Sequence, residues 1–461
     1  MTPAGGGGAF DRLTATDLMY LRLETREWPC HFAGLIVLDG APLLDGEGNL
    51  RSDEIARELA RRLSDVPKLR SRVLWPGPLG GRPIWVEDEK FDAGHHLLSA
   101  TVEPPGGEAE LLTAASALHG RLLDRRRPLW ELSMLTGLAG GRVGVLIKIH
   151  HSVADGMAAL TVMGSLFDPG PNPTRRRGED PYPVPTRAAL IGDNLSSKAR
   201  RARRALSMLS RPRRVISAAG RLARITGHAF GSAGAPGSSL NLPVRAGRRM
   251  GRIVLDLETV RETGRAHGGT VNDVVLALWA AGLRRLLASR SELVDGMELI
   301  AAVPASLRTS SGAVDNQTGT MIVRLPIGDP DPASRLDRIV EATTEAKRAQ
   351  RPEAVMGYLA GLAGTPLGKW FSRRQRASNV IVTNVAGPTG PVSLLGARVL
   401  EFVPMLQLVG NVGLALCAFS YDGALSLVVT ADATAFPDLD VLVEGMEGEW
   451  RNLSAQTPRF G

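Results

Sequence analysis

A strongly basic segment in the middle of the chain divides it into two parts. Residues 171–250 contain 17 Lys or Arg and only 3 Asp or Glu, a net charge of +14, whereas the whole 461-residue chain carries +8. Subtraction leaves −6 for the rest. Prolines open the segment and a Gly/Ser/Pro-rich stretch at 231–238 closes it, which is typical of a linker. The sequence predicts an N-terminal domain at 1–170, a basic linker at 171–246 and a C-terminal domain at 247–461.

Composition is that of an ordinary globular protein. A hydrophobic fraction of 44% and a charged fraction of 22% exclude a disordered chain. Cys30 and Cys417 lie far apart in apolar surroundings, so we expect buried free thiols, no disulfide framework and a reducing compartment. No signal peptide is visible. The longest uncharged stretch near the C-terminus, 402–421, is interrupted by proline and glycines, which favours two strands and a turn over a membrane helix.

Residues 188–210 of the linker have the periodicity of an amphipathic helix. Apolar residues form one stripe and arginines lie mostly elsewhere: Ile191, Leu195, Ala202, Leu206 and Leu209, against Arg200, Arg201, Arg203 and Arg204. Such a helix either binds an anionic membrane surface or packs its stripe on a domain, and both interpretations stay open. No aromatic residues lie between the arginines, so binding of single-stranded nucleic acid is not expected.

The flanking parts alternate strand-like and helix-like runs, which predicts an α/β fold with mixed sheets. The clearest predicted helix is 270–289, with Thr270 as N-cap and Asp273 three residues later. The clearest predicted strands are rich in β-branched and apolar residues: 143–149, 378–385, 412–419 and 425–430.

The first of these strands delivers two adjacent histidines, His150 and His151, and a turn with Asp155 and Gly156 follows. Consecutive side chains of a strand point to opposite faces, so only one histidine can face a given cavity. Histidine is the natural proton acceptor near neutral pH. The competing interpretation is a purely structural pair. A metal site is disfavoured because adjacent strand histidines cannot easily share one ion, and the G-x-S-x-G elbow of serine nucleophiles is absent.

The stretch His150-His-Ser-Val-Ala-Asp-Gly156 matches the HHxxxDG signature of the CoA-dependent acyltransferase superfamily, which includes chloramphenicol acetyltransferase and peptide-synthetase condensation domains. With further motifs in order, nearly the whole chain resembles the bacterial wax ester synthase/diacylglycerol acyltransferase family of the actinobacterial type. Those motifs are Asp17, Glu24, Trp85, Phe91-Asp92, Arg127-Pro-Leu-Trp130, Val271-Asn-Asp-Val-Val-Leu-Ala277, Val303-Pro-Ala-Ser-Leu-Arg308, Asp315-Asn-Gln317, Thr383-Asn-Val-Ala-Gly-Pro388 and Phe419-Ser-Tyr-Asp-Gly423. The family's usual Ser-Asn-Val-Pro-Gly-Pro block is altered here at Thr383 and Ala386.

The resemblance implies two chloramphenicol-acetyltransferase-like domains around a substrate tunnel, joined by the basic linker. Acyl-CoA would enter from one side as co-substrate and the alcohol from the other. His151 would be the general base, His150 mainly structural, and Asp155 would pair with a cation that the sequence does not identify. Gly156 would serve the turn. No metal and no further cofactor are expected.

The resemblance also implies support residues. Asn272 and Asp273 are read equally as positioning residues and as helix-start residues. Pro128 and Trp130 are read mainly as packing residues. Asn384, Gly387 and Pro388 belong to the motif at 383–388, and they either line the tunnel or shape its wall.

The expected activity is acyl-CoA:diacylglycerol O-acyltransferase, forming triacylglycerol. Alternatives are a wax ester synthase using long-chain alcohols, an acyltransferase acting on a carrier-bound polyketide or peptide, or a catalytically silent lipid-surface protein. The intact residues His151, Asp155 and Gly156 argue against the last. A nucleic-acid partner is indicated only by the high pI and is not expected. We expect a cytoplasmic protein attached peripherally to the inner membrane face or to lipid inclusions through residues 188–210.

Overall fold

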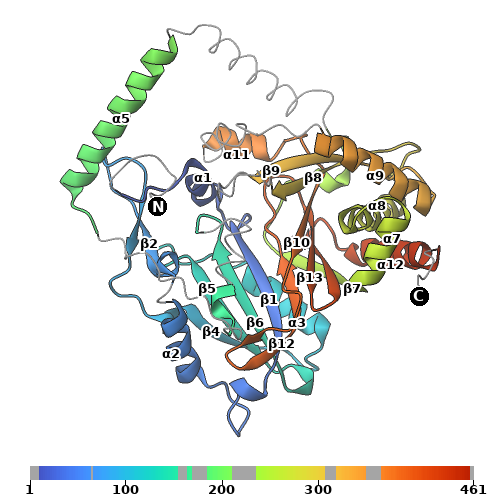
Figure 1. Cartoon of the computed structure of the whole chain (residues 1–461), viewed down its shortest axis with the longest axis horizontal. Helices are drawn as coiled ribbons and strands as arrows, with labels where there is room; N and C mark the ends of the chain where they lie inside the picture. Colours follow the sequence, from blue (N-terminus) through green and yellow to red (C-terminus); the bar gives the residue numbers. More distant parts are fainter. Residues whose placement is uncertain are drawn as a thin grey trace.

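The fold is seen in a computed structural model, in which two six-stranded sheets lie side by side (Figure 1). The described residues are 10–63, 66–153, 164–168, 184–209, 235–306, 318–348 and 365–456. Most of the basic segment, including 171–183 and 210–234, lies outside them. Within these residues no helix is both long enough and apolar enough to cross a membrane.

The first sheet has the strand order β11-β12-β1-β6-β5-β4. It is mixed, because β4 and β5 run parallel whereas the other neighbours run antiparallel. Its strands are β1 (His31–Asp39), β4 (Leu97–Thr101), β5 (Trp130–Thr136), β6 (Arg142–His150), β11 (Ser393–Leu394) and β12 (Ala397–Met405). The predicted strand at 143–149 is therefore confirmed as β6, a central strand buried on both faces.

Two strands of the first sheet come from the far C-terminal part of the chain. β12 pairs antiparallel with β1, from Ala33 opposite Met405 to Leu38 opposite Val399. The predicted division at the linker thus does not hold for 393–405, which completes the N-terminal sheet. The unpaired backbone N–H and C=O groups of an edge strand can pair with any suitable strand. The composition of 393–405 therefore does not reveal which sheet this segment joins.

The second sheet has the order β7-β14-β13-β10-β8-β9 and is also mixed, because β10 runs parallel to both β8 and β13. Three predicted strands are confirmed in it as β10, β13 and β14. Its strands are β7 (Arg248–Asp256), β8 (Leu299–Ser306), β9 (Thr318–Leu325), β10 (Val380–Ala386), β13 (Leu414–Tyr421) and β14 (Ala424–Asp432).

Helices cover the second sheet on the side away from the first (Figure 1). α8 is apolar almost all round, which explains why it is buried between α9, α12 and the sheet. Gly282 and Gly445 let α8 and α12 approach closely, since a Cβ on Gly445 would lie 3.0 Å from the Cα of Gly282. The helices are α7 (Leu257–Ala266), α8 (Val271–Ser289), α9 (Pro332–Arg348) and α12 (Leu439–Gln456).

The remaining elements surround the first sheet. α3 packs between the first sheet and the edge of the second, and its Leu111, Ala115 and Leu118 share a core with Leu35 and Val428. The elements are α1 (Ala15–Leu23), α2 (Ser52–Leu63), α3 (Glu108–His119), α5 (Arg187–Leu209), α11 (Pro366–Ser372) and the hairpin β2–β3 (Ser71–Leu74, Ile84–Glu87). Cys30 and Cys417 are buried free thiols, as expected, and burial raises the pKa of Cys417 to about 12.

Candidate active site

The two histidines lie where β6 ends beside the start of β1. His150 is the last residue of β6 and pairs with His31 of β1. The backbone N–H of His150 donates to the carbonyl of Leu129, and that of His151 donates to the carbonyl of Cys30. The main chain is thereby fixed on both sides, so each imidazole is held in a defined position.

His150 is fully buried and fixed by hydrogen bonds. Its Nδ1 accepts from the backbone N–H of Ser152 at 3.0 Å and lies 2.7 Å from the Ser152 hydroxyl. Because Nδ1 accepts an N–H, it carries no proton, and the proton of the neutral ring belongs on Nε2. Nε2 in turn lies 3.5 Å from Oε1 of Glu24. The Ser152 contact therefore selects one tautomer for the neutral form of the His150 ring.

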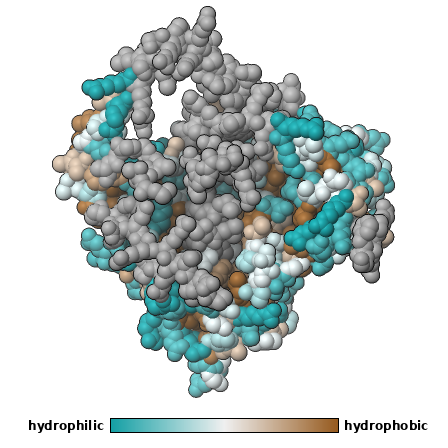
Figure 2. Space-filling view, in the orientation of Figure 1, coloured by the Kyte–Doolittle hydropathy of each residue, from teal (hydrophilic) through white to brown (hydrophobic). Residues whose placement is uncertain are grey.

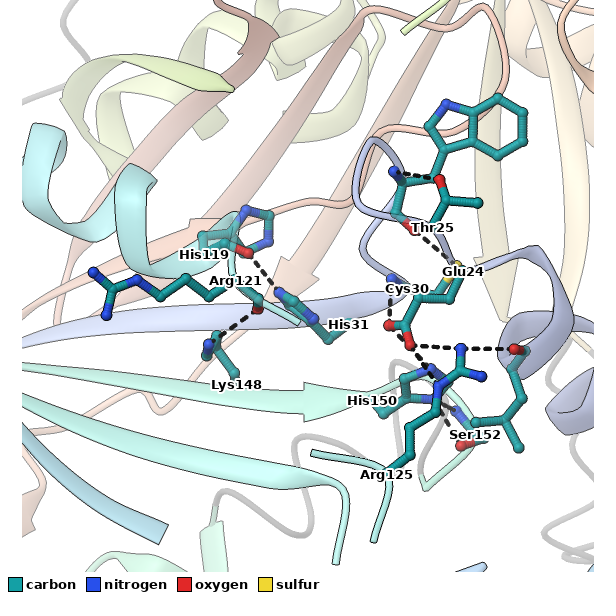
Figure 3. Close-up of polar contacts among 12 residues, drawn as sticks. Glu24, Thr25, Cys30, His31, His119, Arg121, Arg125, Lys148, His150 and Ser152 are labelled. Atoms are coloured by element: carbon teal, nitrogen blue, oxygen red, sulfur yellow. Dashed lines mark hydrogen bonds and ion pairs between the residues drawn. The ribbon is translucent and has the colours of Figure 1, made fainter. Parts of the chain in front are cut away.

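Glu24, the residue that ends α1, contacts His150, Arg125 and the backbone of Cys30 (Figure 3). Its Oε2 accepts two hydrogen bonds from Arg125, at 3.0 and 2.7 Å, and its Oε1 accepts from the backbone N–H of Cys30 at 3.2 Å. Burial alone raises the pKa of Glu24, but His150 and Arg125 outweigh it and lower this pKa to about 2. The carboxylate thus stays charged, and it braces His150 directly and His151 through Cys30.

Sequence reasoning missed this support. Glu24 entered only as part of the family's N-terminal pattern, while Arg125 and Ser152 were given no role. The available signal was weak: Arg125 is 101 residues from Glu24 along the chain, and only the strand pairing brings the two together.

His151 lies in a different environment, held by aromatic contacts. Its ring stacks on Tyr20 with centroids 4.7 Å apart and meets the edge of Phe32 at 5.3 Å. It is half-buried rather than sealed. Burial, with a smaller contribution from His150, lowers the pKa of His151 to about 3. A neutral, partly accessible imidazole can accept a proton from a hydroxyl group brought against it.

The rest of the signature, Asp155 and Gly156, lies outside the described residues, so their expected roles stay predictions.

Pro128 and Trp130 are both buried at the start of β5. Trp130 is 2% exposed, its Nε1 donates to the carbonyl of Leu69, and its ring stacks on His96 with centroids 4.4 Å apart. The intervening Leu129 supplies the carbonyl that holds the backbone of His150. This motif therefore fixes the end of β6 that carries His150.

Asp273 caps α8. Its Oδ2 accepts from the backbone N–H and the hydroxyl of Thr270, and its Oδ1 accepts from Thr343 of α9 at 2.7 Å. Asp273 is 2% exposed, whereas Asn272 is half-buried. These hydrogen bonds match the helix-start interpretation, and they tie α8 to α9 rather than to His151.

The motif around β10 builds a close backbone contact. A Cβ on Gly387 would lie 2.4 Å from the carbonyl oxygen of Ser420 and 2.5 Å from the Phe419 ring, so only glycine fits. Pro388 follows and accepts from the backbone N–H of Asp422, while Asn384 on β10 is exposed. Gly387 and Pro388 thus hold β10 against the β13–β14 hairpin, and their expected place at a tunnel stays a prediction.

A second buried polar group lies on the α3 side of β1 and β6 (Figure 3). Lys148 is fully buried and contacts Glu131 at 2.8 Å and the carbonyl of Leu118 at 3.0 Å. Nε2 of His31 bonds the carbonyl of His119 at 2.7 Å, and burial lowers the pKa of His31 to about 3. Over the described ranges, no three His, Cys, Asp or Glu side chains are arranged to hold a metal ion.

The architecture is that of the two-sheet acyltransferase and condensation enzymes. The starter condensation domain of rhizomide synthetase, solved with C8-CoA, is 13% identical, aligns with 97% of this chain and 94% of its own, and gives a TM-score of 0.55. The first condensation domain of the CDA synthetase, 18% identical, aligns over 97% of both chains with a TM-score of 0.53. These likenesses define the fold class.

Within that class, the chain belongs to the wax ester synthase/diacylglycerol acyltransferase family. The family's catalytic domain matches residues 13–275 and its C-terminal domain matches residues 314–454. The protein is therefore an acyltransferase.

Relatives of full length support this assignment. The wax ester synthase/diacylglycerol acyltransferase of Marinobacter aquaeolei VT8 is 25% identical over 96% of this chain and 99% of its own, with a TM-score of 0.69. A probable diacylglycerol O-acyltransferase of Mycobacterium tuberculosis is 29% identical over 97% of both chains. The O-acyltransferase WSD of Acinetobacter baylyi is 28% identical over 94% of both.

Proposed function

We propose that the protein is an acyl-CoA:diacylglycerol O-acyltransferase that forms triacylglycerol, with His151 as general base. The observation that carries this proposal is the contrast within the histidine pair. The ring of His150 is fully buried, with Nδ1 accepting from Ser152 and Nε2 facing Glu24 at 3.5 Å, whereas the ring of His151 is half-buried and contacts the rings of Tyr20 and Phe32. Only the His151 imidazole is available to a substrate hydroxyl.

In the proposed reaction the acceptor hydroxyl attacks the thioester carbonyl of acyl-CoA. The new ester C–O bond forms and the C–S bond breaks. His151 takes the hydroxyl proton and delivers it to the departing sulfur, so that CoA leaves as the thiol. Both substrates meet at one base, and no acyl-enzyme is needed. A positioned base contributes about 10²–10⁴-fold, and orientation of two bound substrates can contribute more.

The low pKa of His151 shapes this step. An imidazolium is strongly disfavoured where the pKa is about 3, so a proton held there would be transient. Proton transfer to His151 and onward to sulfur is therefore closely coupled to the change from C–S to C–O bonding. The aromatic contacts with Tyr20 and Phe32 cover part of the ring and favour this neutral state.

Diacylglycerol is the proposed acceptor because the mycobacterial relative is named for that activity. A long-chain alcohol, giving a wax ester, is the second candidate, since the Marinobacter relative is named for both. Offering labelled acyl-CoA with diacylglycerol and a long-chain alcohol in competition, followed by product separation, tests the choice. Exclusive wax ester formation would reverse the assignment. Transfer only to a carrier-bound acceptor would reject both candidates.

We also propose that the two halves of the chain enclose a substrate tunnel.

A separate proposal concerns the linker, which attaches the protein peripherally to an anionic membrane face or lipid inclusion on the cytoplasmic side. α5 matches the helix predicted at 188–210. Its first turns pack on the β2–β3 hairpin through Leu190, with an ion pair of 2.7 Å between Arg12 and Asp193. Of the predicted stripe, Ile191 is half-buried, whereas Ala202 is exposed and Leu195 is 56% exposed. This exposure supports an interfacial role for the part of α5 that carries Leu195 and Ala202.

A further inference from the structure

The short helix α11 presents an apolar pair on the molecular surface. Its Leu367 and Trp370 are 54% and 48% exposed, although both are large hydrophobic side chains. They are three residues apart and therefore share one face of the helix, while Gly368 is buried. Thr365 caps the helix by accepting from the backbone N–H of Gly368 at 3.0 Å. The helix is thus anchored, and the exposed pair is a fixed feature of its surface.

Positive charge surrounds this apolar pair. Residues 365–379 contain four cationic side chains and no carboxylate: Lys369, Arg373, Arg374 and Arg376. The Arg374 guanidinium lies 4.6 Å from the centre of the Trp370 ring, so charge and aromatic surface form one unit. Among the ion pairs of the described residues, none neutralises Arg374. The surface therefore combines shallow apolar groups with an excess of positive charge, of which Arg373 faces the carboxylate of Glu27.

This surface lies next to the histidine site. The Arg373 guanidinium lies 5.1 Å from the ring centre of Trp28, which is buried between α1 and β1. Two residues later, the Cys30 carbonyl accepts the backbone N–H of His151. In Figure 1, α11 is drawn near α1 in the upper part of the molecule. A partner seated on α11 would be separated from the site by a single loop.

We propose that the α11 surface, Leu367, Trp370 and Arg374, docks on an anionic phospholipid surface and so holds the acceptor side of the active site against the lipid phase. The inference rests on the proposed function and adds a second contact, independent of α5. Tryptophan favours the membrane–water interface, and basic side chains near an anionic leaflet add binding strength. The α11 surface offers only two large apolar side chains, which fits shallow docking rather than deep insertion. Elsewhere on the molecule, the described atoms visible in Figure 2 are mostly hydrophilic, with scattered apolar patches.

The test is co-sedimentation of the full-length protein with vesicles of phosphatidylcholine alone or mixed with phosphatidylglycerol. The variant Trp370→Ala/Arg374→Gln should lower the partition coefficient on the mixed vesicles by at least about fivefold, the contribution of one charge near an anionic surface. Trp370→Phe should retain most of the binding. A matched control removes one exposed apolar side chain and one arginine elsewhere, Val294→Ala/Arg265→Gln, and should bind like the unaltered protein.

The inference is overturned by unchanged sedimentation of the α11 variant with an unchanged melting temperature, and equally by the same loss of binding in the matched control. A smaller species of the variant in gel filtration would instead identify the surface as a self-association face, and would also reject lipid docking. His151→Ala, run in parallel, separates the two proposals. It should sediment normally while failing to transfer acyl groups, so retained transfer would reject only the mechanism.

Discussion

His150 and His151 are adjacent in the chain, yet the fold gives them opposite environments. His150 is sealed behind β6 and held by Ser152 and Glu24, whereas His151 rests among Tyr20 and Phe32 with its ring partly accessible. The difference follows from strand geometry, which sends neighbouring side chains to opposite faces. Residue type alone therefore does not assign a role. The role of each histidine follows from the groups within reach of its ring.

The largest expected effect comes from removing the accessible ring. His151→Ala should lower kcat by about 10²–10⁴-fold, the contribution of a positioned base, with the fold kept because the ring is half-buried. Steady-state transfer from labelled acyl-CoA measures this, and thermal melting serves as the control. His150→Ala should instead lower the melting temperature, because it leaves Glu24 buried without one of its partners. Wild-type turnover in His151→Ala would reject the mechanism.

A smaller effect is expected from the shared support. Glu24→Gln keeps the shape but removes the charge that faces Arg125 and His150, and we expect kcat to fall roughly tenfold to a hundredfold with little change in KM for acyl-CoA. Arg125→Gln should cost less, since Arg125 is 41% exposed and the contacts of Glu24 with His150 and Cys30 remain.

Asp124→Asn is the matched control for the support, because Asp124 precedes Arg125 but pairs with the exposed Arg126. It should leave kcat unchanged. If Glu24→Gln and Asp124→Asn behave alike, Glu24 does not position the histidines.

Stability should depend on pH because several histidines are buried in their neutral form. Burial lowers the pKa of His31 and His151 to about 3 and that of His119 well below its ordinary value. The unfolded chain takes up these protons near pH 6.5, whereas the folded chain does not, so the free energy of unfolding should fall as pH drops from about 6.5 to about 3. Glu24 adds a further loss as pH falls through the range from about 4.5 to about 2.

Urea unfolding at a series of pH values measures this slope. His151→Ala should make it shallower, whereas substitution of the exposed His95 by Asn should not. A slope that is unchanged by His151→Ala would mean that His151 protonates in the folded state.

The smallest expected effect is that of chelation. The proposed step needs only His151 and the two substrates, so dialysis against EDTA should leave the transfer rate unchanged within error. A loss that Zn²⁺ or Mg²⁺ restores would require a metal in the reaction.

Local patterns made much of the fold predictable. The apolar run before His150 predicts β6, and the Thr270–Asp273 spacing predicts the start of α8, because both depend on neighbouring residues alone. β12 pairs with β1 from a distant part of the chain, and Arg125 contacts Glu24 across 101 residues. No local sequence pattern encodes either contact. For the same reason, the sequence predicts the histidine pair, which is a local motif, but does not predict the contacts of Glu24 and Arg125 that hold it.

The central claim, that one histidine of the pair is an available neutral base while the other is locked in one tautomer, is tested most directly by ¹⁵N NMR of the histidine rings, with signals assigned by substitution. The predicted result is a His151 ring that stays neutral from about pH 8 to about pH 5, below the ordinary histidine value of about 6.5, and a His150 ring protonated on Nε2. A His151 signal that titrates near pH 6.5, or a His150 ring protonated on Nδ1, would contradict it.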